Sequence, residues 1–126
     1  MGIIPQCWYD ILSREGVDKR VQGILGIWKK YLSSELYNTI NYLEENLLDI
    51  ELFKLNDKYH LLYSIKTEAG EIQYYGGGNP VDSIAGTELE RVWNKIPGSI
   101  CCFYENIHNG FMIMLARQWE LYVQRI

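Results

Sequence analysis

The stretch 87–111, TELERVWNKIPGSICCFYENIHNGF, decides how this chain is expected to fold. Thr87 and Glu90 have the spacing of a capping box, in which a hydroxyl and a carboxylate bind unpaired N–H groups at a helix start. Apolar side chains then recur at helical spacing, at Leu89, Val92, Trp93 and Ile96. Pro97 ends this helix because proline cannot continue the backbone hydrogen bonds.

A second short helix is predicted after Pro97, with Ser99 as its cap. Its apolar residues share one helical face, at Ile100, Phe103, Tyr104 and Ile107. Asn109-Gly110 supplies the left-handed exit of such a helix, so Gly110 is expected to have a positive φ. The stretch thus predicts a helix–Pro–helix corner over 87–108, with Trp93, Phe103 and Tyr104 mostly buried. The residues assigned to the fold are Trp93, Pro97, Phe103, Tyr104, Asn109 and Gly110.

These residues also resemble a known family signature. Trp93-x-x-Ile96-Pro97, then Phe103-Tyr104 and His108-Asn109-Gly110-Phe111, is similar to the hallmark of the SUKH superfamily, over about residues 86–115. Many members are bacterial immunity proteins that neutralise polymorphic toxins. The resemblance implies one SUKH-like domain over 1–126 whose protein partner is a cognate toxin domain. Members usually continue past the Asn-Gly turn with further strands, so it also implies a C-terminally shortened domain.

Composition and charge exclude several classes of protein. The chain has 126 residues, 48% apolar and 22% charged, which is typical of one soluble globular domain. Its net charge of −4 argues against a nucleic-acid partner. The start lacks a secretory signal and no apolar run approaches ~18 residues, so no membrane association is expected. Adjacent Cys101 and Cys102, with Cys7 left over, make no disulfide framework and indicate a reducing cytoplasm.

Acidic residues are concentrated in two segments that contain no base. Residues 31–53 contain five acids and no Lys or Arg. Residues 67–90 contain five more acids, again without Lys or Arg. A solvated face explains this pattern, and so does complementarity to a basic protein partner. On charge and expected exposure alone, the candidate partner-binding residues are Glu44, Glu45, Glu68, Glu71, Tyr74 and Tyr75.

The first half of the chain predicts helices followed by a meander. Residues 8–32 have a broken helical rhythm that indicates one or two helices, and Ser33 or Ser34 then caps a clear amphipathic helix. The core stripe of that helix is Leu36, Ile40, Leu43 and Leu47. Alternation over about 50–75, broken by turns at Asn56-Asp57-Lys58 and Glu68-Ala69-Gly70, predicts three antiparallel strands.

The remaining segments complete an α+β domain in which helices pack against an antiparallel sheet. The glycine run 76–78, with Asn79-Pro80, is interpreted as a flexible connector to the corner. Residues 111–115 and 119–123 are apolar enough for one further strand or a terminal helix.

No catalytic or metal-binding pattern stands out. The glycine run lacks the Lys and Ser/Thr of a phosphate-binding loop, and no Gly-x-Ser-x-Gly elbow is present. His60 is expected on a strand boundary, and His108 as a cation at a helix C-terminus. We therefore expect a non-enzymatic binding module without metal or cofactor. The alternatives are a ligand-binding domain or enzyme with a pocket near His60/His108, and a regulatory interaction protein unrelated to toxins.

Overall fold

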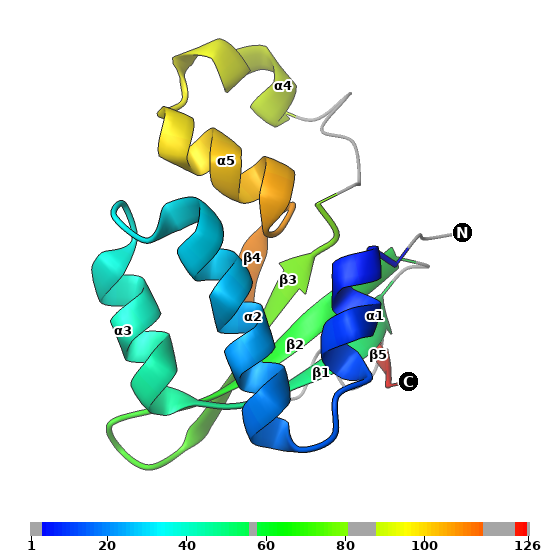
Figure 1. The fold of residues 1–126 in the computed structure, drawn as a ribbon. Helices are drawn as coiled ribbons and strands as arrows, with labels where there is room; N and C mark the ends of the chain where they lie inside the picture. Colours follow the sequence, from blue (N-terminus) through cyan, green and yellow to red (C-terminus); the bar gives the residue numbers. More distant parts are fainter. Residues whose placement is uncertain (1–3, 56–57, 81–87, 115–122, 126) are drawn as a thin grey trace.

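The computed structural model describes residues 4–55, 58–80, 88–114 and 123–125. Helices lie on one side of an antiparallel sheet, which is the expected α+β architecture (Figure 1). In the described part the sheet has five strands in the order β4-β3-β2-β1-β5. The strands are β1 (Leu47–Leu55), β2 (Lys58–Lys66), β3 (Ile72–Gly78), β4 (Phe111–Met114) and β5 (Val123–Arg125).

Residues 8–32 form two helices. Helix α1 (Gln6–Leu12) is followed by α2 (Val17–Leu32), and Gly16 between them has a φ of 91°. Helix α3 (Tyr37–Asn46) begins later than predicted, with Leu36 rather than a serine at the N-cap. The N–H of Leu36 donates to the Leu32 carbonyl at 3.0 Å, so the preceding serines continue the last turn of α2. The predicted core stripe is confirmed in part. Ile40 and Leu43 are buried on α3, whereas Leu47 is buried as the first residue of β1 and Leu36 is only partly buried at the N-cap.

The predicted three-stranded meander is confirmed, and one further strand lies at each edge of the sheet. Strand β1 pairs with β2, and β2 with β3, both antiparallel. After the corner, Phe111–Met114 forms β4 beside β3 and Val123–Arg125 forms β5 beside β1, so the described part has two edge strands where one strand or a terminal helix is predicted. Asn56 and Asp57 of the predicted turn, and all of residues 115–122, lie outside the described residues. Leu61, Tyr63 and Ile65 of β2 point toward the helices and are fully or almost fully buried there.

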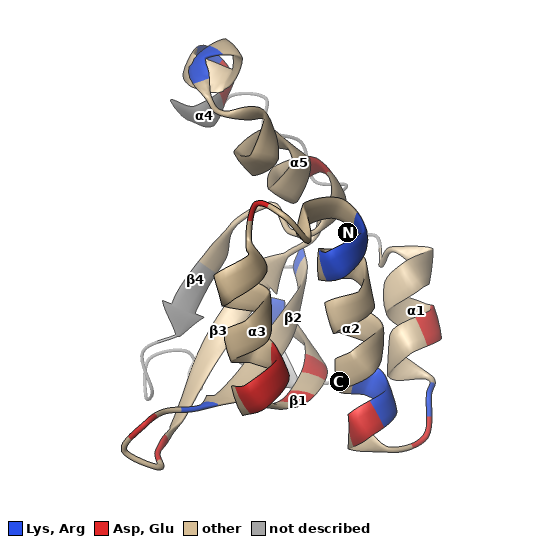
Figure 2. Ribbon diagram, turned by 60° about the vertical axis from the view of Figure 1, so that its left-hand side comes forward, with Lys and Arg blue, Asp and Glu red and all other residues tan. Residues whose placement is uncertain are grey.

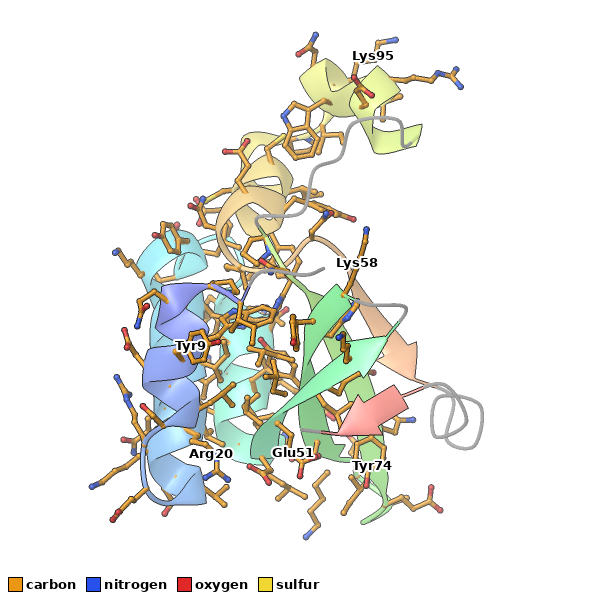
Figure 3. All side chains as sticks on the ribbon, turned by 90° about the vertical axis from the view of Figure 1, so that its right-hand side faces the viewer. Tyr9, Arg20, Glu51, Lys58, Tyr74 and Lys95 are labelled. Atoms are coloured by element: carbon orange, nitrogen blue, oxygen red, sulfur yellow. The ribbon has the colours of Figure 1, made fainter. Side chains whose placement is uncertain are left out.

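The helix–Pro–helix corner forms as predicted but projects from the body (Figures 1 and 3). It consists of α4 (Glu88–Val92), the 3-10 turn η1 (Trp93–Lys95) and α5 (Gly98–Asn106), with Pro97 rather than Ser99 at the N-cap of α5. The capping residue Thr87 lies outside the described residues.

Burial of the corner is less than expected. Trp93, Phe103 and Tyr104 are only partly buried, so the prediction that they are mostly buried is wrong. Trp93 packs edge-on against Tyr104 with ring centroids 6.1 Å apart, while Phe103 reaches Trp28 of α2 at 5.2 Å. Phe103 therefore joins the corner to the body, and the Trp93–Tyr104 pair stiffens the projecting part. In the ranges that the structure covers, no helix is both long and apolar enough to cross a bilayer.

Candidate functional site

The residue with the most unusual environment is His108, which follows α5 and is completely buried. Its Nδ1 lies 2.8 Å from the Gly78 carbonyl oxygen of β3. Its Nε2 forms a short hydrogen bond with the Tyr63 hydroxyl of β2. The Tyr63 oxygen in turn accepts the indole N–H of Trp28 at 3.0 Å. One histidine thus connects the corner to two strands and, through tyrosine, to α2.

The partners of His108 determine its protonation. A carbonyl oxygen can only accept, so Nδ1 carries the proton and Nε2 accepts the Tyr63 O–H. This arrangement satisfies both ring nitrogens with a neutral ring. Burial lowers the pKa of His108 from 6.5 to about 4, against the opposing effect of the Gly78 bond. Burial also raises the pKa of Tyr63 above its ordinary 10.0. The expected cation at a helix end is therefore wrong, because desolvation outweighs a dipole effect of about 0.3–1 kcal/mol.

The glycine run is part of this site. Gly76, Gly77 and Gly78 are buried in β3, so their interpretation as a flexible connector is wrong. A Cβ on Gly77 would lie 2.5 Å from three atoms of the His108 ring, and one on Gly78 would lie 2.3 Å from the Asn109 carbonyl oxygen. Glycine is required here because the ring and the backbone after α5 lie directly against the strand.

The Asn-Gly turn holds this contact in place. The Gly78 N–H donates to the Gly110 carbonyl at 2.9 Å, and the Asn109 N–H donates to the Gly78 carbonyl at 3.3 Å. Gly110 has a φ of 95°, as predicted. Phe111 then stacks on His108 with ring centroids 5.9 Å apart. The residues of the quoted motif from His108 to Phe111 therefore build the junction between α5 and β4.

His60 lies on the other face of the sheet. It adjoins Leu61, which points toward the helices, so alternation along β2 directs His60 away from them. Its ring stacks on Phe53 at 5.1 Å, and its Nδ1 lies 3.1 Å from the Lys58 carbonyl. His60 is a boundary residue, as expected, and the two histidines do not face a common space.

The acidic candidates are partly neutralised by bases that are distant in sequence. Glu44 forms an ion pair with Lys29 of α2 at 2.5 Å, and Asp49 forms one with Arg20 at 2.9 Å. Glu45 on α3 and the pair Glu68 and Glu71 in the β2–β3 turn are exposed. Figure 2 places the acids of α3 and of that turn at the same end of the molecule.

The two tyrosine candidates lie on opposite faces of the sheet. Tyr75 pairs with Tyr63 in the ladder and stacks on Phe111, with centroids 5.3 Å apart and planes 10° apart. It packs against the core and is not an exposed binding residue, so this assignment is corrected. Tyr74 points away from the helices and is also only partly buried (Figure 3). No single surface can use both rings.

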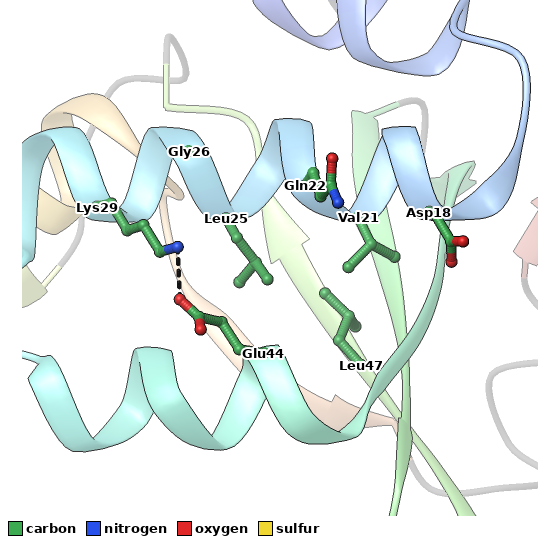
Figure 4. Close-up of a pocket in the computed structure, with 8 residues that line it drawn as sticks. All are labelled: Asp18, Val21, Gln22, Leu25, Gly26, Lys29, Glu44 and Leu47. Atoms are coloured by element: carbon green, nitrogen blue, oxygen red, sulfur yellow. Dashed lines mark ion pairs between the residues drawn. The ribbon is translucent and has the colours of Figure 1, made fainter.

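A groove that was not predicted from the sequence lies between α2 and α3. It has a volume of about 580 Å³, and its lining residues are Asp18, Val21, Gln22, Leu25, Gly26, Lys29, Glu44 and Leu47 (Figure 4). The Lys29–Glu44 ion pair crosses it. Gly26 on α2 lines this groove, and its lack of a side chain is a feature of the sequence that is consistent with an opening here.

The described part of the chain offers no cluster of metal ligands. Within the described ranges, no three His, Cys, Asp or Glu side chains come together as metal ligands. No protein-family model, curated protein or solved structure matches this chain.

Proposed function

We propose that this chain is a non-enzymatic protein-binding module that acts as a bacterial immunity protein. It binds a cognate toxin domain and occludes the active site or the substrate path of that domain. The chemistry of such a module is that of an interface, with shape and charge complementarity and no turnover.

The non-enzymatic part of the proposal is supported by the structural role of His108. Both of its ring nitrogens are hydrogen-bonded within the fold, and the ring is neutral and completely buried. A general base must reach the proton that it abstracts from a substrate, and this ring has neither a free nitrogen nor a path to solvent.

The immunity part of the proposal is supported by the resemblance of residues 93–111 to the SUKH signature. In this chain, those residues fold as a helix–Pro–helix corner whose last turn docks on the sheet through His108 and Gly110. The exposed acids Glu45, Glu68 and Glu71 at one end of the molecule fit a basic partner.

The experiment is a growth-rescue assay. The genes next to that for this chain are searched for a toxin domain, and a domain found there is expressed in a test bacterium, alone and together with this chain. Restored growth and co-purification of an equimolar complex are expected. A control immunity protein from an unrelated toxin pair should restore nothing.

Two results would contradict the proposal in different ways. Absence of both rescue and complex would refute the immunity role. Capture of a stable partner unrelated to any toxin would instead favour a regulatory interaction protein.

A further inference from the structure

We infer that the groove between α2 and α3 receives a basic side chain of the protein partner, together with an apolar neighbour. This inference rests on the proposed function and names the part of the surface that would recognise the toxin domain. The groove has a volume of about 580 Å³, which is enough room for a long side chain and an apolar neighbour.

Part of the groove lining is apolar. It consists of Leu25 and Leu47, which are buried, and Val21, which is partly buried. Val21 and Leu25 come from α2 and Leu47 is the first residue of β1, so the apolar lining lies at the base of the groove (Figure 4). An aliphatic side chain placed there would contact mainly Val21, the partly exposed member of this lining.

The charges that line the groove favour a basic residue as its occupant. Of the eight lining residues, Asp18 and Glu44 are acids and Lys29 is the single base. Lys29 is paired with one oxygen of Glu44, and the two side chains are 51% and 40% exposed. An exposed pair of this kind contributes little to stability, so Glu44 can exchange Lys29 for an incoming base at low cost. Glu45 and the acids of the β2–β3 turn lie at the same end, interspersed with the bases Lys19 and Lys66.

Gly26 allows this groove to be tested without damage to the fold. It is exposed on α2, and a Cβ at this position would meet no atom within 4 Å. A longer side chain there would extend over the groove. Gly26→Lys and Gly26→Glu both add a flexible side chain with better helix propensity than glycine, and the two side chains carry opposite charges. Gly98→Lys is the matched control, because Gly98 is exposed on α5 and equally open.

The first measurement is the binding kinetics of these variants with the toxin domain of the rescue assay. Gly26→Lys should weaken binding at least tenfold and slow association, while Gly26→Glu should lose at most a few fold. Lys29→Gln should accelerate association, since it frees Glu44. Gly98→Lys should behave as wild type. Equal affinities for Gly26→Lys and Gly26→Glu, with rescue intact, would overturn the groove inference and leave the proposed function standing.

A second measurement tests the groove even if no toxin binds. A short synthetic peptide of alternating leucine and lysine is titrated into the isotope-labelled chain, and amide shifts are followed by NMR. Shifts should concentrate at Val21, Gln22, Gly26 and Leu47, and should be lost in Gly26→Lys. A peptide of alternating leucine and glutamate should leave these amides unchanged. Equal responses to both peptides, or shifts elsewhere only, would overturn the inference independently of the immunity role.

Discussion

Gly77→Ala is expected to be one of the most damaging small substitutions in this protein. The added methyl group would lie 2.5 Å from Cδ2, Cε1 and Nε2 of His108. The ring cannot retreat freely, because its two nitrogens are bonded to the Gly78 carbonyl and the Tyr63 hydroxyl. Overpacking of a core costs about 1–3 kcal/mol, and each buried polar group left without a partner costs about 1–3 kcal/mol more. We therefore expect a loss of about 3 kcal/mol or more from a total stability of roughly 5–15 kcal/mol.

The assay is urea unfolding followed by tryptophan fluorescence, with Gly26→Ala as the matched control. A Cβ at Gly26 meets nothing, and alanine favours a helix, so this variant should be more stable by about 0.5–1 kcal/mol. In a His108→Ala background the obstructing ring is absent, so the cost of Gly77→Ala should fall by at least half. The reasoning is refuted if Gly77→Ala is as stable as wild type, or if its cost is the same with and without the ring.

Three further predictions concern acid stability, the buried hydroxyl and the acidic end. The folded-state pKa of His108, about 4, lies below the unfolded value of 6.5, so its contribution is complete above pH 6.5 and is lost as pH falls toward 4. The loss should be about 3 kcal/mol in urea titrations over that range, and His108→Ala should remove this dependence. Tyr63→Phe leaves the Trp28 N–H and the His108 Nε2 unpaired, and should lower the free energy of unfolding by about 2–4 kcal/mol in the same assay. A loss below ~1 kcal/mol would mean that a water molecule replaces the hydroxyl. The third prediction concerns the joint charge reversal of three exposed acids, Glu45→Lys, Glu68→Lys and Glu71→Lys. It should slow partner association at low salt and leave thermal stability nearly unchanged. Unaltered association kinetics would mean that these acids are solvated and do not contact the partner.

Local patterns predicted the elements of this fold well. The alternation in 50–75 and the helical spacing of Ile40 and Leu43 depend on neighbours within a few residues, and both appear in the structure. The same holds for Gly110, whose positive φ follows from its place after a helix. The late start of α3 shows the limit of this reasoning, because a serine can continue a helix as well as cap one.

The candidate site could not be predicted in the same way, because its contacts join distant residues. His108 reaches Tyr63, 45 positions away, and Gly78, 30 positions away. Glycine gives the same sequence signal in a loose connector and in a strand that another ring approaches closely, so Gly77 was misread. A count of charge along the chain likewise missed that Arg20 would pair with Asp49.

The most direct test of the proposed function is a titration of this chain into an activity assay of a toxin domain encoded beside its gene. The account predicts that toxin activity falls linearly and reaches zero at an equimolar ratio, because inhibition requires one bound module for each toxin. Loss of activity at a small fraction of that ratio would show that the chain turns over and is an enzyme. Full toxin activity at an excess of the chain would contradict the immunity role itself.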